Sequence, residues 1–190
     1  MEGSVGKRLF DVVGALGGLL CFAPIMLATA LAILMEDGPP IVFRQQRLGH
    51  RRRPFTILKF RSMRDGCVTR VGRLLRATGL DELPQFVNIL RGELSAVGPR
   101  PLTAADTERL GWATARHDFR WSVRPGLTGL AQIVGTNAAR QALFLDRRYI
   151  DGRSLFLDLR LVALSFAVNA LGKPRMRRLL LRRHRRHART

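Results

Sequence analysis

The sequence predicts an α+β protein that is mainly helical, with an N-terminal re-entrant membrane helix and a small cytoplasmic α/β body that carries interfacial amphipathic helices. Three observations indicate this class. Residues 12–34 contain no charged side chain. Short alternating segments suited to strands follow before residue 64, and helical periodicity predominates beyond them. With 190 residues, 46% of them hydrophobic, the chain is long enough to bury a core, which excludes a wholly disordered protein.

The apolar segment at 12–34 is long enough to cross a bilayer with a hydrocarbon core of about 30 Å. It does not fit a signal peptide, because the run is too long and acidic residues and prolines follow it instead of a small-residue cleavage site. Cations lie on both flanks, and the positive-inside rule draws both to the cytoplasm. We therefore predict a helix that kinks at Pro24 and leaves the membrane on the side it entered, with a simple span as the alternative.

Two short strands are expected directly after this helix, at 41–43 and 55–63, with a turn at 48–50 between them. Period-two alternation in the second strand places Lys59 and Arg61 on one face. Both cations are therefore expected to point to the same side of the body.

Helices dominate the rest of the predicted body. Gly79 is expected to end the helix at 69–78, and Thr103 with Asp106 resembles a capping box that opens the helix at 103–116. The last one is strongly apolar, but its uncharged part is too short to span, so it is expected to lie in the membrane interface or to pack on the body. The predicted elements are helices at 69–78, 81–90, 103–116, 137–149 and 154–171, a loop at 124–129 and a short strand at 131–134.

Positive charge exceeds negative charge throughout the chain. The sequence has 33 Lys and Arg against 14 Asp and Glu, a net charge of +19, and only three of the cations are lysines. Guanidinium groups suit phosphates and anionic lipid. Nine cations and no acid lie in residues 173–190. This tail is open to three interpretations: a solvated arm, an arm on anionic lipid, or an arm on nucleic acid.

The adjacent carboxylates Asp81 and Glu82 form the richest stretch for chemistry. At the N-terminus of a helix, the dipole and free N–H groups stabilise an ionised aspartate, which can ligate Mg²⁺ or attack phosphorus. Alone, the pair favours an ordinary helix cap. Several cations accompany it, as a diphosphate–metal site requires, and two of them lie on turns fixed by proline. These cations are Lys59, Arg61, Arg73, Arg76, Arg100 and Arg124.

A series of motifs occurs in a fixed order along the chain. They are Lys7-Arg8-Leu9-Phe10-Asp11, the apolar segment broken at Pro24, and residues 43–49, 59–63, 80–85, 97–101, 124–129 and 131–132. In this order they resemble the bacterial sugar transferase family, the monotopic polyprenyl-phosphate phosphoglycosyl transferases. The resemblance covers roughly residues 5–172 and is highly specific.

The resemblance implies that a UDP-sugar gives its phosphosugar to undecaprenyl phosphate and releases UMP, as the first membrane step of polysaccharide or glycoconjugate biosynthesis. It implies that Asp81 is the nucleophile of a covalent intermediate and a ligand of the required Mg²⁺, and that Glu82 assists it. Together with the charge pattern, it assigns phosphate and other substrate contacts to Lys59, Arg61, Arg76, Arg100, Pro101, Arg124, Gln132 and Asn137.

The implied location is the cytoplasmic face of the bacterial inner membrane, with the anionic lipid bilayer as a partner and no specific nucleic acid. A second copy, in a homodimer, is a further candidate partner. The expected units are a re-entrant membrane helix hairpin at 1–36, a cytoplasmic catalytic domain at 37–172 and a basic tail at 173–190.

Three features depart from the family pattern. Ala23 replaces a serine before Pro24, Thr136 stands where the family has an arginine, and the connection from 63 to 69 is shorter than the usual insertion. None of them involves the Asp81–Glu82 pair.

Two other functions stay open on the residues alone. A nucleic-acid-binding protein would use the tail, but this function leaves the apolar segment and the carboxylate pair unexplained. A non-catalytic membrane scaffold would hold anionic lipid with its arginines, and UMP release distinguishes a transferase from it.

Overall fold

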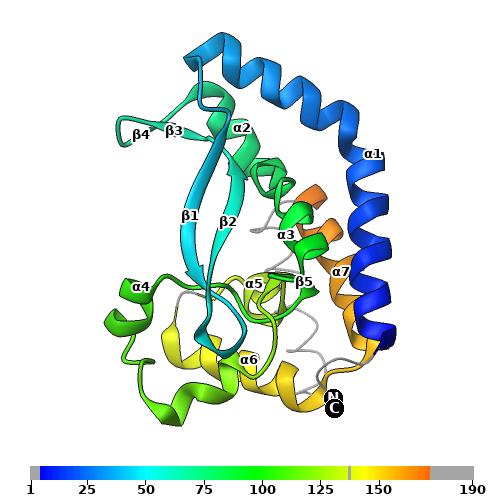
Figure 1. Ribbon diagram of the computed structural model, residues 1–190, viewed down its shortest axis with the longest axis vertical. Coiled ribbons are helices and arrows are strands. Elements are labelled where there is room, and N and C mark those ends of the chain that lie inside the picture. The colour runs from blue at the N-terminus through cyan, green and yellow to red at the C-terminus, as the bar shows by residue number, and fades with distance from the viewer. Residues whose placement is uncertain (1–4, 137, 172–190) are drawn as a thin grey trace, which may run out of the picture.

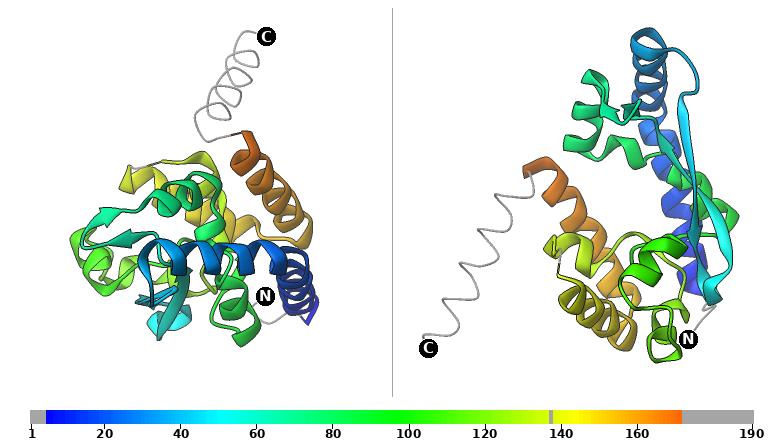
Figure 2. Two further views of the ribbon diagram at one scale, coloured as in Figure 1. Left: turned by 90° about the horizontal axis from the view of Figure 1, so that it is seen from above. Right: turned by 90° about the vertical axis from the view of Figure 1, so that its left-hand side faces the viewer.

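The computed structural model describes residues 5–136 and 138–171. Within these residues the chain is mainly helical, with three two-stranded sheets, which confirms the predicted mainly helical α+β class. Seen from the side, α1 and the first two strands form one side of the molecule, and α6 and α7 form the other (Figure 2). Asn137 and the basic tail at 173–190 lie outside the described residues.

The N-terminal helix α1 (Val5–Asp37) has 33 residues and contains Pro24. Figure 1 shows that α1 is bent: its first part stands along the body, and its last part leans over towards the start of β1. Among the described helices, it is the one long and apolar enough to cross a membrane. Large apolar side chains such as Leu20 and Leu27 are exposed along it. The re-entrant path itself remains a prediction.

The strands β1 (Val42–Leu48) and β2 (Pro54–Phe60) form an antiparallel ribbon. A 3₁₀ turn (His50–Arg52) joins them. β1 is longer than the predicted 41–43, because its alternating residues continue to pair with β2 as far as Leu48 opposite Pro54. β2 is shorter than the predicted 55–63, because residues beyond Phe60 enter a second small hairpin.

That second hairpin consists of β3 (Met63–Arg64) and β4 (Cys67–Val68). Asp65 and Gly66, which connect the strands, both have positive φ, at 48° and 80°. This is the pattern of a type I′ turn, for which an Asp-Gly pair is a recognised sequence signal. The sequence analysis missed this signal.

The predicted helix at 69–78 is confirmed as α2 (Arg70–Thr78). The side chain of Thr69 accepts a hydrogen bond from Gly72 N, and Gly79 ends the helix with φ 76°. The other long helices agree broadly with expectation. The remaining helices are α3 (Gln85–Arg91), α4 (Ala104–Arg109), a 3₁₀ helix (Ala115–Trp121), α5 (Leu130–Val134), α6 (Ala139–Gly152) and α7 (Leu155–Leu171).

Other predicted elements are also wrong in type or length. The capping box at Thr103 opens α4 as expected, but α4 ends at Arg109, two residues before Gly111 with its φ of 71°. The predicted strand at 131–134 is instead the short helix α5, which Gly135 ends in the left-handed region. A run of four apolar residues does not distinguish a strand from a helix.

The strand that exists in this region lies a few residues earlier, inside the predicted loop at 124–129. β6 (Gly126–Thr128) pairs in parallel with β5 (Ser95–Val97). The pairing brings two proline-containing turns, far apart in sequence, against each other.

The core fills the space between α1, the ribbon and α3. Ala15 of α1 packs in one buried cluster with Ile57 and Ile89, and Ile33 packs in another with Phe60 and Leu75. A Cβ at Gly18 would lie 2.7 Å from the Phe86 ring, so a larger residue at this helix crossing would displace that ring. α1 is therefore part of the fold of the body as well as its apolar anchor.

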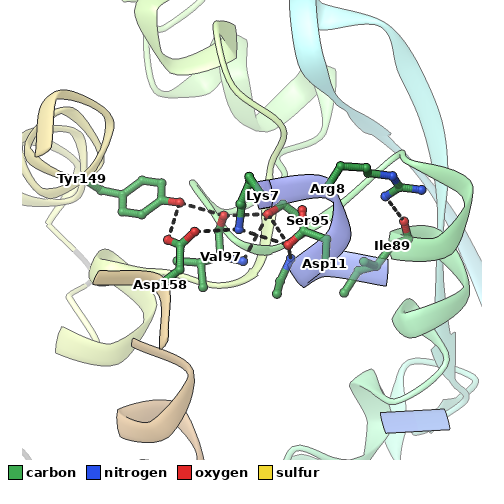
Figure 3. A network of polar contacts seen from close by, with 9 residues as sticks. Lys7, Arg8, Asp11, Ile89, Ser95, Val97, Tyr149 and Asp158 are labelled. Atoms are coloured by element: carbon green, nitrogen blue, oxygen red, sulfur yellow. Dashed lines mark hydrogen bonds and ion pairs between the residues drawn. The ribbon is translucent and has the colours of Figure 1, made fainter. Parts of the chain in front are cut away.

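Arg8 joins α1 to the end of α3 by a second route. Its guanidinium donates to Ile89 O at 2.7 Å (Figure 3). It also donates to Leu90 O at 2.8 Å. These carbonyls lie in the last turn of α3, where helix carbonyls lack partners and a cation is favourable.

A buried polar network, which we call the junction network, joins α1 to β5, α6 and α7 (Figure 3). Lys7 Nζ lies 3.0 Å from Asp11 Oδ1 and 2.7 Å from Asp158 Oδ2. Asp11 Oδ1 accepts from Ser95 Oγ and from Ala96 N. The two carboxylates are almost fully buried, at 1% and 2% exposed.

Tyr149 completes the junction network. Its hydroxyl lies 2.9 Å from Asp158 Oδ1 and 3.0 Å from Val97 O. Burial, followed by the charge of Asp158, raises the pKa of Tyr149. Four elements are thus fixed to one another where α1 begins.

Candidate active site

A cavity of about 610 Å³ lies between the β1–β2 ribbon and α7. Its wall includes residues of β1, β2, α2, the 80–82 turn, the turn at 100–101, β6, α5 and α7. The structure brings eight of the predicted site residues together around it. They are Lys59, Arg61, Arg76, Asp81, Glu82, Arg100, Pro101 and Gln132.

Asp81 and Glu82 do not open a helix as predicted. They lie in a separate 3₁₀ turn (Leu80–Glu82), and α3 begins only at Gln85. Pro84 explains the break, because it has no N–H to donate to the carbonyl of Leu80 and its ring would clash there. Leu83 N donates to that carbonyl instead, at 3.3 Å.

The environment of Asp81 also differs from the expectation. A helix N-terminus would favour the ionised form, but the pKa of Asp81 is raised, first by burial and then by the charge of Glu82. Lys59 and Arg76 act in the opposite direction. Lys59 Nζ forms an ion pair with Glu82 Oε1 at 2.6 Å. The carboxylate of Asp81 is thus held in a partly buried position where it ionises less readily than an exposed aspartate.

Hydrogen bonds fix two of the cavity arginines. Arg76 Nε donates to Ser62 Oγ at 2.9 Å, and Arg61 donates to Gly38 O at 2.6 Å. Arg100 is exposed at the cavity, on the turn between Pro99 and Pro101. These guanidinium groups come from separate elements, so their positions depend on the fold and not on local sequence.

One predicted contact is not brought to the cavity. Arg124 is half-buried and does not line it. Its backbone carbonyl packs against Gly98, where a Cβ would lie 2.5 Å away. Asn137 lies outside the described residues. Pro24 belongs to α1 and is not part of the cavity wall.

The two proline-containing turns are joined back to back. Gly98 N donates to Thr128 O and Gly126 N donates to Pro99 O, both at 2.9 Å. A Cβ at Gly126 would lie 2.0 Å from Gly98 N, so the backbones meet where no side chain fits. The segment that carries Arg100 is therefore rigidly attached to β6.

A buried ion pair supports the same segment from behind. Arg120 Nε lies 2.7 Å from Asp146 Oδ2, and each side chain is 4% exposed. The guanidinium also donates to Arg100 O at 2.6 Å. Trp112 and Trp121 pack on it at 5.2 and 5.7 Å from their ring centres. Arg120 thus holds the backbone from which Arg100 projects.

Arg47 is a cavity residue that the sequence analysis did not select. It donates to Pro101 O at 3.2 Å and to Gln45 Oε1 at 2.5 Å. Burial, followed by the charge of Arg100, lowers its pKa. Phe43, Gln45 and Arg47 all line the cavity. Their period-two spacing was a signal in the sequence.

α7 contributes one wall of the cavity through Ser165, Val168 and Asn169. These positions have helical i, i+3, i+4 spacing, whereas Phe156, Leu159 and other large apolar side chains on α7 are exposed. Because the helix is so hydrophobic overall, the sequence analysis did not select its two polar cavity residues, Ser165 and Asn169.

The residues present fit a divalent cation that is bound by protein carboxylates and by phosphate oxygens of a ligand. Mg²⁺ is usually held by one or two carboxylates plus substrate phosphate oxygens and water. Asp81 and Glu82 supply two adjacent carboxylates in a cavity rich in phosphate-binding cations. Within residues 5–136 and 138–171, no group of three or more His, Cys, Asp or Glu could hold a metal ion by itself.

Comparison with known proteins gives a consistent result. Residues 2–171 match the family model described as Bacterial sugar transferase. UDP-glucose:undecaprenyl-phosphate glucose-1-phosphate transferase of Caulobacter vibrioides is 42% identical over 177 residues, which cover 82% of this chain and 66% of that protein. The uncharacterized sugar transferase EpsL of Bacillus subtilis is 40% identical over 173 residues, 84% of each chain.

UDP-N-acetylgalactosamine-undecaprenyl-phosphate N-acetylgalactosaminephosphotransferase of Aeromonas hydrophila is 39% identical over 175 residues. The match covers 82% of this chain but only 41% of that protein. This chain therefore spans less than two thirds of the length of some of the curated relatives that it matches.

Proposed function

The chain belongs to the bacterial sugar transferase family, and from this premise we propose that it transfers a phosphosugar from a UDP-sugar to undecaprenyl phosphate. The products are undecaprenyl-diphosphate-sugar and UMP. The observation that carries the proposal is the partly buried Asp81 in a cavity with five cations, in a chain whose helix α1 is exposed, apolar and long enough to cross a membrane. Such a cavity suits a diphosphate, and the apolar helix suits an acceptor that stays in the membrane.

In the first step, a carboxylate oxygen of Asp81 attacks the β-phosphorus of the UDP-sugar. A bond forms between Asp81 and phosphorus, and the bond from phosphorus to the bridging oxygen breaks. UMP leaves with the electron pair of that bond, and the phosphosugar stays on Asp81. Lys59 and Arg76 favour the ionised carboxylate that this attack requires.

In the second step, a phosphate oxygen of undecaprenyl phosphate attacks the same phosphorus. The Asp81–phosphorus bond breaks, and its electron pair returns to the carboxylate. The surrounding arginines compensate the negative charge of both phosphoryl groups. The rigid segment of Arg100 keeps the backbone from which its guanidinium projects in place through both steps.

The adjacent carboxylates support the proposal of a magnesium-dependent reaction. Asp81, with Glu82 beside it, would hold Mg²⁺ together with donor phosphate oxygens, and the ion would neutralise charge on the diphosphate. The ion pair with Lys59 orients Glu82 in this arrangement.

UMP release, measured with a panel of UDP-sugars and undecaprenyl phosphate in detergent, tests the function. We expect release that requires both the acceptor and Mg²⁺ for full turnover, and a single preferred sugar. A protein that releases no UMP with any donor would be the non-catalytic scaffold or the nucleic-acid binder instead.

We further propose that both flanks of α1 lie in the cytoplasm, which places the cavity on the cytoplasmic face of the plasma membrane. Cysteines introduced at Gly3 and Arg53, in a variant without Cys21 and Cys67, test this topology. We expect an impermeant thiol reagent to label neither position in intact cells. Labelling of Gly3→Cys from outside would show that the helix spans.

A further inference from the structure

Two buried amide side chains lie one turn apart on α3, and their surroundings differ. Asn88 is 0% exposed and Gln85 is 2% exposed. Asn88 Oδ1 accepts from Leu58 N at 3.0 Å, and its Nδ2 donates to Thr56 O at 2.7 Å and to Glu93 Oε2 at 2.6 Å. The hydrogen-bonding groups of Asn88 are therefore satisfied by the fold.

The amide N–H₂ group of Gln85 has no such partner among the described residues. Its Nε2 is buried and finds no hydrogen-bond acceptor in the part of the chain that the structure describes. A buried donor without an acceptor destabilises a fold, and an apolar side chain of the same size would remove that penalty. Among the described residues, the fold therefore provides no acceptor for the amide N–H of Gln85.

The position of Gln85 indicates what the amide is for. Gln85 lines the same cavity as Asp81, and Asp81 precedes it by four residues in the chain. The last side-chain torsion of a glutamine is soft, so a rotation about it can exchange the positions of the amide nitrogen and oxygen at the cavity wall. Among the groups around that cavity are the cations Lys59, Arg76 and Arg100, which favour an anionic ligand.

We propose that Gln85 is a substrate-binding residue whose amide N–H donates to a phosphoryl oxygen of the ligand in this cavity. The inference rests on the proposed function, because it requires a phosphorylated ligand beside Asp81. A neutral donor provides a directed hydrogen bond without adding another cation to a crowded positive site. The phosphoryl group belongs to the nucleotide donor or to the polyprenyl phosphate, and the experiment distinguishes the two.

The variant Gln85→Met tests the proposal, because methionine has a similar size and no donor. We expect its melting temperature in detergent to stay unchanged or to rise by about 2–4 °C. We expect kcat/KM to fall about 10- to 100-fold, the loss typical of a hydrogen bond to a charged oxygen. Gln85→Glu should lose more activity than Gln85→Met, because its carboxylate repels the phosphate.

Asn88→Leu is the matched control on the same helix. It removes a buried amide that the fold uses, so its melting temperature should fall. The opposite shifts in stability of the two variants are the signature of a ligand contact as opposed to a structural one. A Gln85→Met protein that melts lower than wild type and has normal kcat/KM would overturn the proposal.

Further measurements identify the phosphate. A higher KM for the UDP-sugar assigns the contact to the nucleotide, and a higher KM for undecaprenyl phosphate alone assigns it to the acceptor. An effect limited to one sugar, with UDP binding unchanged, would mean a contact to a sugar hydroxyl and would overturn the phosphoryl assignment.

Binding of UDP without acceptor separates this inference from the proposed function. If the wild type releases no UMP, the proposed function fails. The contact is then decided by whether UDP raises the melting temperature of the wild type more than that of Gln85→Met. An equal rise in both proteins, or none in either, would overturn it.

Discussion

The junction network and the cavity both bring charged side chains together. Only in the junction network do these side chains all satisfy one another. In the junction network, Lys7 lies between the carboxylates of Asp11 and Asp158, and Ser95 and Tyr149 add further hydrogen bonds. In the cavity, five cations face two carboxylates, and the amide of Gln85 lacks an acceptor among the described residues. The excess of cations and the free amide donor favour a ligand with anionic oxygens, such as a diphosphate.

The difference separates polar groups that stabilise the fold from groups kept for a ligand. A change in the junction network should reduce stability, because it leaves a buried charge without its partner. A change in the cavity should reduce turnover and leave stability the same or higher, because its groups are not satisfied by the protein. The predictions below test this separation.

The largest effect is expected from Asp81→Asn, which should reduce UMP release by at least about 10³-fold. An amide is not a nucleophile for phosphorus. Stability should not fall, because the raised pKa of Asp81 means that the fold disfavours its ionised form. Thermal denaturation near neutral pH should show an equal or higher melting temperature. A variant that keeps a near-normal rate would remove Asp81 from the mechanism.

Lys7→Met should have the largest effect on stability, a loss of about 3 kcal/mol. The substitution leaves Asp11 and Asp158 buried without their shared cation. Arg147→Met is the control, since Arg147 also pairs with an aspartate four residues later, but on the surface. The control should change stability by about 0.5 kcal/mol or less. Equal effects in denaturant unfolding would contradict a structural role for the junction network.

The pH dependence of kcat/KM should have an acid limb at a higher pH than an ordinary aspartate with a pKa of 3.8 would give. The direction follows from the raised pKa of Asp81, which keeps the nucleophile protonated to higher pH. Glu82→Gln should move this limb to lower pH, because the charge of Glu82 contributes to the shift. An unchanged limb in the residual activity of that variant would assign it to another group.

The smallest effect on chemistry is expected from deletion of residues 174–190. The tail should add membrane attachment, on the order of 1 kcal/mol for each arginine near anionic headgroups. Retention on anionic liposomes should fall, and most at low salt, where charges are least screened. Turnover in detergent with saturating substrates should stay nearly unchanged. A folded deletion variant without turnover would place the tail in the active site.

The sequence was sufficient for features that depend on local chemistry. The caps at Thr69 and Gly79 set the ends of α2, and the spacing of Lys59 and Arg61 brought both to the cavity. The order of the motifs predicted the family. Local patterns did not show that Pro84 would separate Asp81 from α3, because a proline in a first helical turn and a proline that ends a 3₁₀ turn look alike in sequence.

The remaining features depend on contacts between distant segments. No local pattern relates Lys7 to Asp158, or Arg120 to the backbone of Arg100. The short parallel pair β5–β6 was hidden for the same reason, because its strands are only three residues long and two helical elements separate them in the chain. Arg47 could have been selected from its alternation with Gln45, but the unsatisfied amide of Gln85 only became visible with its neighbours in place.

The junction network also sets an order of events during biosynthesis. When α1 leaves the ribosome, Asp11 can reach Lys7 through the i, i+4 spacing, whereas Ser95 and Ala96, its other partners in the network, have not yet been made. Ser95 and Asp158 are made later, and at usual translation rates roughly 7–30 s separate Asp11 from Asp158. Through that interval the nascent helix carries a paired charge next to its apolar segment. The Lys7–Asp158 ion pair can therefore join α1 to the body only when α7 has been synthesised.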